Sequence, residues 1–414
     1  MKILKTFFLC IILIFLLEYI VYADDIDTET LEDISPYIET TSNIITEPSI
    51  NSRAAIVYDR NSGLILFGKN ENEKRKMAST TKIMTAIIVI ENSNLDDIVT
   101  ISSKAAGTGG SRLGLHTNDK ISVKNLLYGL LLCSGNDAAV ALAEYVGKDV
   151  SGFADLMNAK AKELNLNNTH FVTPHGLDND EHYTTAYELA IITNYALKNE
   201  LFCKIVGTKN ITISINNYSK TLSNTNELLG NLNGVYGVKT GFTNGANRCL
   251  VTSVKRNNMD IICVVLGADT KKDRTKDSIE LIEYTFNNFE LINIKEKIEE
   301  EFYNWKTCNI SNFIINKGVS NNIDIYLDNI PYNFLPVNSN QINNYSIYIY
   351  CDKQLSAPLP KDSVIGFLTV SLDNKTIISI DIKLSETISQ KNVSDYFKNM
   401  ITNYIFSLES IFFQ

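Results

Sequence analysis

The sequence has no Cys-x-x-Cys pair, and its seven cysteines are scattered at irregular intervals over 414 residues. Zinc sites and disulfide frameworks usually place cysteines at short, regular spacings, so neither is indicated. Six cysteines could still pair if Cys10 leaves with the N-terminal segment described below. We expect free, buried thiols instead.

The chain also lacks an excess of positive charge, with 38 Lys and Arg against 47 Asp and Glu and a formal net charge of −9. Loss of residues 1–23 would remove Lys2, Lys5 and Glu18, a net charge of +1, and leave −10. An acidic surface of that size argues against nucleic acid as a partner. The 44% hydrophobic and 21% charged residues are typical of a globular chain, and the length allows two domains.

Residues 1–23 are typical of a secretory signal peptide. Two lysines precede a compact apolar stretch at 6–17, and the small residue Ala23 precedes Asp24. The alternative is an uncleaved membrane anchor, although Glu18 interrupts the apolar run. We therefore expect the protein to be exported and to act outside the cytoplasm.

Residues 24–50 contain no Lys or Arg and carry eight acidic side chains. Such a segment cannot bury much apolar surface, and we predict an acidic, disordered tether.

Residues 51–290 combine strand and helix patterns. A hairpin is predicted at 53–59 and 64–68, helical spacing runs from 77 to about 200, and strands return near 235–254 and 259–267 before a helix at about 272–287. Strands before and after a helical block indicate one α/β domain, an antiparallel sheet covered by helices with a helical subdomain.

Residues 291–385 alternate apolar and polar side chains with period two, and Asp373-Asn374 marks a tight turn. We predict a separate, small all-β domain with a spacing or interaction role, because it contains no cluster of catalytic residue types.

Residues 390–414 predict a C-terminal amphipathic helix. Its apolar face comprises Val393, Phe397, Met400, Ile401, Tyr404, Ile405, Leu408, Ile411 and Phe412. The segment is too short and too interrupted to span a bilayer, and we expect it to lie in the membrane interface. The alternative is a helix that packs back on the β domain.

The stretch "MASTTKIMTAIIVIE", residues 77–91, places Ser79 and Lys82 at the start of an otherwise apolar helix. Residues three apart on a helix are neighbours, so the two side chains can meet. A serine hydroxyl becomes a good nucleophile when an adjacent base takes its proton, and burial can make a lysine that base. The alternative is an ordinary helix start with Lys82 in solvent.

Two further motifs favour the catalytic interpretation. "SGN" at 134–136 separates an apolar run from a helical segment, and "KTG" at 239–241 lies at the head of a hairpin strand. Ser-x-x-Lys and Lys-Thr-Gly each occur once, and the order and setting of all three motifs match a known signature of serine acyl-transfer enzymes.

The sequence resembles the low-molecular-mass penicillin-binding proteins, which are D-alanyl-D-alanine carboxypeptidases. The resemblance covers nearly the whole chain and includes "RAAIVYDRNSG", "SRLGL" at 111–115, "LLLCSGNDAAVALAE", "THFVTPHGLD" at 169–178 and "GVKTGFT". It implies a penicillin-binding, serine β-lactamase-like catalytic domain at the outer face of the bacterial cytoplasmic membrane or in the cell wall. Its substrate would be a peptidoglycan stem peptide ending in D-Ala-D-Ala, β-lactams would acylate it, and no cofactor would be needed.

The resemblance also implies roles for individual residues. Ser79 would be the nucleophile, Lys82 its general base, and Ser134 the relay of the proton to the leaving amine. The residues implied in substrate binding are Asn136, Lys239, Thr240, Gly241, Phe242 and Arg274, with the backbone N–H groups of Ser79 and Phe242 as the oxyanion hole. At Arg274 a solvated surface cation is the alternative.

Two other functions stay open on sequence grounds. Glu163 fits a Glu-x-x-Leu-Asn pattern that resembles the deacylating glutamate of class A β-lactamases, although we expect it to point to solvent. A non-hydrolysing β-lactam or peptidoglycan sensor is the second. His170, His175 and His182 fit no helical zinc motif, and we predict no metal.

Overall fold

The computed structural model describes residues 34, 46–216, 218–320, 322–342 and 344–412. The predicted signal peptide lies outside the described residues, as do most of the predicted tether at 24–50 and the last two residues. The chain divides into two units between Asn288 and Phe289.

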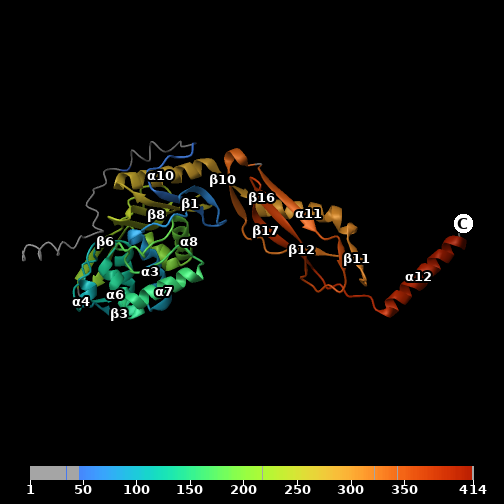
Figure 1. Ribbon diagram of the computed structural model, residues 1–414, viewed down its shortest axis with the longest axis horizontal. Coiled ribbons are helices and arrows are strands. Elements are labelled where there is room, and N and C mark those ends of the chain that lie inside the picture. Colours follow the sequence, from blue (N-terminus) through green and yellow to red (C-terminus); the bar gives the residue numbers. More distant parts are fainter. Residues whose placement is uncertain (1–33, 35–45, 217, 321, 343, 413–414) are drawn as a thin grey trace, which may run out of the picture. The chain divides into compact units, whose positions relative to one another are not determined.

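The first unit is built on a five-stranded antiparallel sheet in the order β2-β1-β9-β8-β7. The strands are β1 (Ala54–Asp59), β2 (Ile65–Lys69), β7 (Val235–Thr243), β8 (Asn247–Arg256) and β9 (Met259–Ala268). All six residues of β1 are buried, so the sheet is covered on both faces. Figure 1 shows α10 (Lys271–Asn288) along one side of the sheet and α8 (Ala186–Ala196) along the other. The predicted hairpin, strands and covering helix are confirmed.

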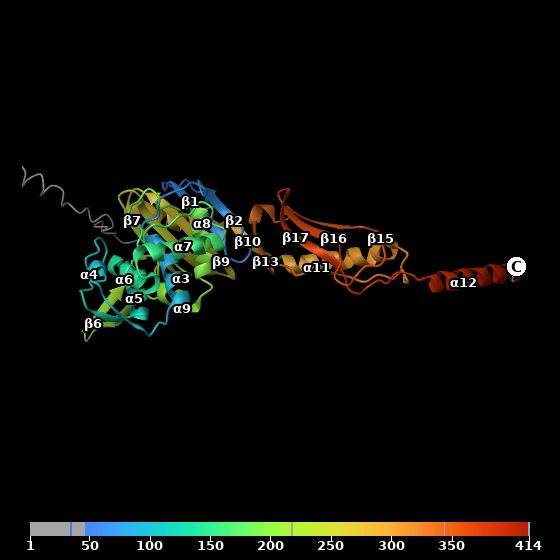
Figure 2. The same ribbon diagram turned by 60° about the horizontal axis from the view of Figure 1, so that its bottom comes forward.

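A helical part completes the first unit and lies beside the sheet in both views (Figures 1 and 2). Its helices are η1 (Ala78–Thr81), α3 (Lys82–Asn92), α4 (Ser103–Ala106), α5 (Val123–Leu131), α6 (Asn136–Gly147), α7 (Val150–Glu163) and α9 (Glu200–Val206). This part also contains two short antiparallel strand pairs, β3 (Ile98–Thr100) with β4 (Lys120–Ser122) and β5 (Asn210–Ile215) with β6 (Tyr218–Ser223).

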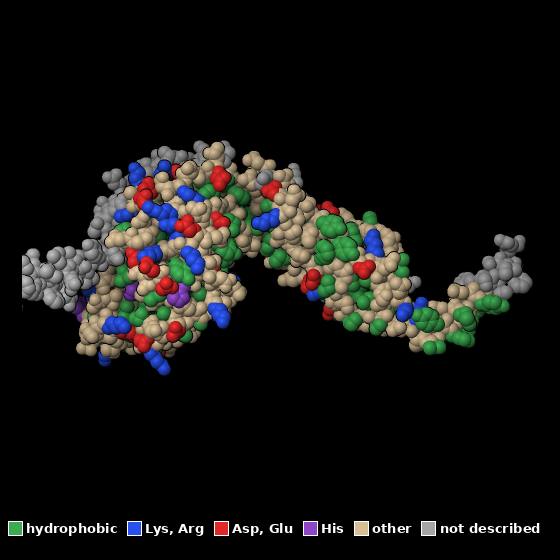
Figure 3. Space-filling view, viewed as in Figure 1, with side chains coloured by type: hydrophobic (Ala, Val, Ile, Leu, Met, Phe, Trp, Pro, Cys, Tyr) green, Lys and Arg blue, Asp and Glu red, His purple; other side chains and the backbone are tan. Residues whose placement is uncertain are grey.

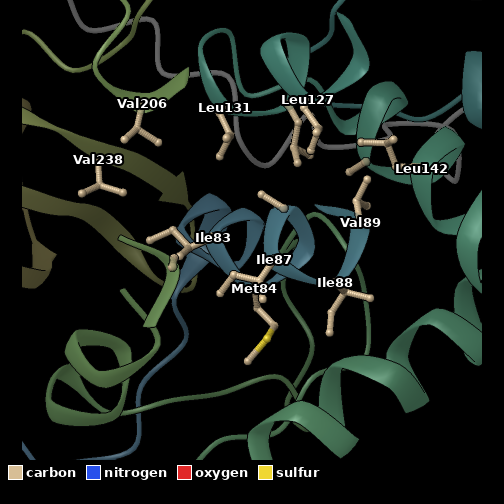
Figure 4. Packing of buried hydrophobic residues seen from close by; sticks show 14 of the residues in the cluster. Ile83, Met84, Ile87, Ile88, Val89, Leu127, Leu131, Leu142, Val206 and Val238 are labelled. Carbon is tan, nitrogen blue, oxygen red and sulfur yellow. The ribbon is translucent and has the colours of Figure 1, made fainter. Parts of the chain in front are cut away.

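Helix α3 forms the centre of the hydrophobic core. Ile83 and Ile87 are buried, and the helix is surrounded by Leu127 and Leu131 of α5 and Leu142 of α6 (Figure 4). Burying a large aliphatic side chain contributes roughly 1.5–3 kcal/mol, so packing fixes this helix firmly. Any group at its N-terminus is therefore held by a rigid element.

The second unit contains a four-stranded sheet in the order β12-β17-β16-β14. Its strands are β12 (Ile325–Leu327), β14 (Tyr345–Cys351), β16 (Val364–Leu372) and β17 (Lys375–Leu384). Two strand pairs accompany it, β10 (Phe289–Asn293) with β13 (Phe334–Asn338) and β11 (Ile314–Asn316) with β15 (Gln354–Ser356). Asp373 and Asn374 both have positive φ and form the predicted turn between β16 and β17.

These strands confirm the predicted β domain, but the range 291–385 also contains a helix that we did not predict, α11 (Ile294–Asn309), with short turns η2 (Ile310–Asn312) and η3 (Ser339–Gln341). Ile294, Ile298 and Phe302 are its buried residues. Their spacing of four is a helical signal that the surrounding strand pattern obscured.

The chain's last described element is α12 (Val393–Phe412), within the range predicted for the amphipathic helix. Its apolar side chains from Val393 to Ile405 are exposed, and Figure 3 shows a band of hydrophobic side chains along it. Within the described residues, no helix is both long and apolar enough to cross a bilayer.

The six described cysteines are all free thiols, as predicted. Only Cys249, Cys263 and Cys351 are buried, so the expectation that every thiol would be buried is wrong. Cys308 is exposed, because it lies near the end of α11.

Candidate active site

Ser79 lies in η1, the tight turn that leads directly into α3. The preceding Ala78 has a φ of 48°, a left-handed conformation that a non-glycine residue rarely adopts. The Thr81 hydroxyl donates to the Ala78 carbonyl at 2.8 Å, and the Thr80 hydroxyl donates to the Met77 carbonyl at 2.6 Å. The polar residues around Ser79 therefore hold the turn that presents it.

Lys82, the first residue of α3, is fully buried and reaches Ser79. Its Nζ lies 2.6 Å from Ser79 Oγ, 2.6 Å from Asn136 Oδ1, 3.3 Å from Ser134 Oγ and 3.2 Å from the His175 carbonyl oxygen. These acceptors are all neutral oxygens. A buried amine in such surroundings is well placed to exchange a proton with the serine hydroxyl.

Ser134 and Asn136 come from the connection between α5 and α6. Ser134 has a φ of 61°, and Asn136 begins α6. The Asn136 amide donates to the Gly109 carbonyl at 2.8 Å, which orients its oxygen toward Lys82. The sequence-predicted Ser79, Lys82, Ser134 and Asn136 thus form one hydrogen-bonded cluster.

Strand β7, at the edge of the sheet, supplies the opposite wall. Thr240, Gly241 and Phe242 line the pocket, while Lys239 is buried and its Nζ donates to the Thr240 carbonyl at 2.9 Å. A Cβ on Gly241 would lie 3.1 Å from Ser79 N. Glycine therefore keeps the space around that backbone N–H open.

Arg274, on α10, is buried beside the same pocket and is not a solvated surface cation. Its Nη2 forms an ion pair with Glu227 Oε1, and the Thr275 hydroxyl donates to the same carboxylate oxygen at 2.5 Å. Sequence reasoning missed Glu227, because its partner is 47 positions away.

The pocket has a volume of about 380 Å³. The residues around it are Ser79, Gly110, Ser111, Arg112, Ser134, Thr225, Thr240, Gly241, Phe242, Lys271 and Arg274. Six of the nine predicted site residues are in this set, and Lys82, Asn136 and Lys239 are buried behind it. Three of the lining residues are cations, which suits an anionic ligand.

Ser111 and Arg112 belong to the "SRLGL" stretch, to which the sequence analysis gave no role. A buried carboxylate holds this loop in place: Asp137 accepts from the backbone N–H of Leu113 at 2.7 Å, Gly114 at 2.7 Å and Leu115 at 2.9 Å. Because Asp137 follows Asn136 directly, one short segment both contacts Lys82 and anchors the facing loop.

The loop "PHGLD", residues 174–178, packs against the turn that carries Ser79. Gly176 has a φ of 87°, and a Cβ there would lie 2.0 Å from the Ala78 carbonyl oxygen. His182 Nδ1 accepts from Val172 N at 3.0 Å, so its Nε2, 2.8 Å from Thr81 Oγ1, carries the proton and donates. His182 therefore supports the nucleophile turn as a neutral ring.

Glu163, the residue of the β-lactamase alternative, lies at the end of α7 and does not line the pocket. Its side chain is 59% exposed and forms an ion pair with Lys160 at 2.7 Å. A carboxylate that points to solvent cannot activate a water at Ser79, so this geometry disfavours the β-lactamase mechanism.

Comparison with known proteins agrees with this geometry. The family model for D-alanyl-D-alanine carboxypeptidases matches residues 41–270, and the model for the penicillin-binding protein 5 C-terminal domain matches 314–390. The D-alanyl-D-alanine carboxypeptidase DacF of Bacillus subtilis (strain 168) is 32% identical over 359 residues, which cover 85% of this chain and 90% of that protein.

One curated sequence and one solved structure from Haemophilus influenzae are also similar to this chain. The D-alanyl-D-alanine carboxypeptidase DacA is 33% identical over 364 residues, covering 84% of this chain and 88% of that one. The crystal structure of penicillin binding protein 5 superposes with a TM-score of 0.70 at 31% identity and covers 84% of this chain and 100% of that chain. The fold, the serine–lysine site and these matches together show that the chain belongs to the D-alanyl-D-alanine carboxypeptidase family.

Proposed function

We propose that Ser79 is the nucleophile of a serine D-Ala-D-Ala carboxypeptidase that removes the terminal D-alanine from peptidoglycan stem peptides. The observation that carries the assignment is the 2.6 Å contact between Ser79 Oγ and the buried Lys82 Nζ at the floor of a cationic pocket. A peptidase needs this pairing of a nucleophile and a base, whereas a binding protein does not.

Acylation begins when neutral Lys82 takes the Ser79 hydroxyl proton and Ser79 Oγ attacks the carbonyl carbon of the D-Ala–D-Ala bond. The backbone N–H groups of Ser79 and Phe242 stabilise the oxyanion, and Gly241 leaves room for it. The C–N bond then breaks, and Ser134, 3.3 Å from Lys82 Nζ, passes the proton to the leaving amine. D-Alanine leaves, and the penultimate D-alanine stays as an ester on Ser79.

The substrate backbone fits along β7, because an edge strand can pair with an extended peptide. Its terminal carboxylate lies toward Thr240 and Arg274, and buried Lys239 adds positive charge from behind. Water then hydrolyses the ester, with Lys82 again exchanging the proton. A β-lactam presents a similar carboxylate and acyl group and acylates Ser79 in the same way.

The test is D-alanine release from a diacyl-L-Lys-D-Ala-D-Ala peptide by the wild type and by Ser79→Ala. We expect release by the wild type and a loss of at least about 1,000-fold in the variant. A Ser79→Ala protein that released D-alanine at the wild-type rate would exclude Ser79 as the nucleophile.

We further propose that the protein is exported by residues 1–23 and held at the outer face of the cytoplasmic membrane by α12. The support is the pattern of the N-terminal segment and the exposed apolar face of α12, which includes Phe397, Met400 and Ile401. Only Lys398 adds positive charge between 392 and 412. Burial of apolar area, more than charge, would therefore drive binding.

Flotation with phosphatidylethanolamine–phosphatidylglycerol vesicles tests the anchor. The double variant Phe397→Asp/Ile401→Asp should stay with the soluble fraction, and the matched control Asn399→Asp on the polar face should float like the wild type. Equal flotation of both variants would argue against α12 as the membrane anchor. A mature N-terminus other than Asp24 would argue against the predicted cleavage after Ala23.

A further inference from the structure

The cation at the carboxylate end of the pocket is already paired with an acid of the protein itself. Arg274 and Glu227 have side chains that are only 3% and 15% exposed, and they meet through Nη2 and Oε1. Among the described residues, Arg274 Nε and Glu227 Oε2 have no hydrogen-bond partner. The pair is thus joined by one hydrogen bond, and the guanidinium keeps other N–H donors for a ligand.

Glu227 lies in the same short loop as a residue of the pocket wall. Thr225 lines the pocket, and its hydroxyl lies 2.7 Å from that of Thr240, which we assign to the substrate carboxylate. Glu227 follows two positions later, and Arg274 lines the same pocket. The negative charge of Glu227 is therefore paired with a cation that lines the pocket proposed for the substrate carboxylate.

The surroundings of Glu227 favour its ionised form. Burial alone would raise the pKa of its carboxyl, but the charge of Arg274 and the hydroxyl of Thr275 hold that pKa below its usual value. An ionised carboxylate fixed to Arg274 orients the guanidinium and also cancels part of its charge.

We propose that Glu227 sets how tightly and how selectively the pocket holds the free carboxylate of the substrate, acting through Arg274 as a positioning residue. The proposal rests on the assignment of this pocket to a D-Ala-D-Ala peptide. Leaving D-alanine carries the same carboxylate as the substrate, so a site with an uncompensated arginine would also retain its product. Binding that is equally tight in the substrate complex and in the transition state does not raise the rate of the chemical step.

Calorimetric binding in a Ser79→Ala background isolates this effect from chemistry. The ligands are Nα,Nε-diacetyl-L-Lys-D-Ala-D-Ala and its C-terminal amide, and the readout is the ratio of their affinities. Glu227→Gln keeps an acceptor for Arg274 and removes the charge. We expect the free acid to bind about tenfold more tightly, the Coulomb effect of one charge several ångströms away at intermediate dielectric, and the amide to bind as before.

Charge and length are separated by two matched pairs. Glu227→Asp keeps the charge on a shorter side chain, and Glu227→Asn is its neutral counterpart. The acid-to-amide ratio should follow the charge, so that Asp resembles the wild type and Asn resembles Gln. Glu283→Gln is the control. Glu283 lies on α10, as Arg274 does, and pairs with Arg256 of β8 at 2.7 Å, but it does not line the pocket.

A ratio that is the same in Glu and Gln, or that follows side-chain length, would overturn this proposal alone. A shift of the ratio in Glu283→Gln as large as in Glu227→Gln would do the same, because the effect would then be one of helix stability. Failure of the free acid to bind any variant would overturn the proposed function as well.

Discussion

Two lysines of the first unit, the fully buried Lys82 and the partly exposed Lys160, show how the groups around an amine determine what it can do. Lys160, on α7, is 12% exposed and contacts Glu163 at 2.7 Å, Glu91 at 3.0 Å and the Tyr195 hydroxyl at 3.3 Å. Burial alone would lower the pKa of Lys160, but the hydrogen bonds to Glu163, Glu91 and Tyr195 raise it well above its usual value. Lys160 is therefore a permanent cation that links two helices.

Lys82 is buried more completely but faces hydroxyl, amide and carbonyl oxygens. Neutral acceptors such as these orient the amine without adding a negative charge that would hold its proton, which is what the proposed role as general base requires. The comparison teaches that burial does not by itself make a lysine a base. The charge of the groups around a buried amine also affects how readily it gives up its proton.

The largest expected effect comes from removing each lysine in turn. Lys82→Ala should lower the rate of Ser79 acylation by about 10²–10⁴-fold, the usual contribution of a general base, with the fold intact. Lys160→Ala should keep that rate within a factor of about two and lower the free energy of unfolding, because two carboxylates lose their partner. Stopped-flow experiments with a fluorescent β-lactam measure the acylation rate, and chemical unfolding measures the free energy of unfolding.

A reversed result, in which Lys160→Ala abolished acylation and Lys82→Ala did not, would break the comparison. Equal losses in both variants would show that fold stability, not base chemistry, controls the rate.

Asn136→Asp sharpens the comparison, because it gives Lys82 the kind of partner that Lys160 has. The carboxylate would replace an amide oxygen 2.6 Å from Lys82 Nζ and favour the ammonium form. We expect acylation at pH 7 to fall by about 100-fold and the rate to recover toward alkaline pH. A pH–rate profile that keeps the wild-type shape in this variant would argue against a neutral Lys82.

The histidines behind Lys82 provide a pH prediction. Burial, Lys82 and His182 lower the pKa of His175 to about 3, and burial with a contribution from His170 lowers that of His182 to about 4, from an ordinary value of 6.5. At a pH between the folded and the ordinary pKa of each histidine, that histidine binds a proton in the unfolded chain but not in the folded one. Their contribution to stability is complete above pH 6.5 and is lost as the pH falls, by about 3 kcal/mol per histidine at pH 4.

Urea unfolding at pH 7.5, 5.5 and 4.5 measures this loss. His182→Gln should be less stable than the wild type at pH 7.5, because the link to Thr81 changes, but should lose less stability between pH 7.5 and 4.5. The same pH dependence in both proteins would show that His182 is not buried as a neutral ring.

The smallest effect is expected at the acid that holds Lys160. Glu163→Gln should leave acylation and hydrolysis of the acyl-enzyme unchanged and alter the free energy of unfolding by no more than about 0.5 kcal/mol, because its side chain is 59% exposed. The lifetime of the β-lactam adduct measures the rate of acyl-enzyme hydrolysis. A lifetime at least tenfold longer in Glu163→Gln would revive the deacylation role that the geometry disfavours.

Much of the site could be predicted because most of its residues lie in three short sequence motifs. Ser79 and Lys82 are three residues apart, Ser134 and Asn136 are two apart, and Lys239 and Thr240 are adjacent in the sequence. Local spacing and strand alternation decide such features. The sheet, the covering helix and the turn at Asp373 follow from the same kind of signal.

The rest depends on contacts between distant segments. Nothing near Glu227 in the sequence indicates Arg274, and nothing near Asp137 indicates that its carboxylate accepts hydrogen bonds from the loop at 113–115. The start of α3 at Lys82, after a separate turn for Ser79, is set by packing against β7 and the loop of Gly176. The missed α11 shows that a helical signal can be overlooked between strand patterns.

The most direct test of the account is intact-mass analysis of the protein after brief exposure to a penicillin, followed by peptide mapping. We predict one adduct per chain, located on Ser79, absent in Ser79→Ala and formed far more slowly in Lys82→Ala. An adduct on another residue, or one that formed equally fast without Lys82, would contradict the assignment of this serine–lysine pair.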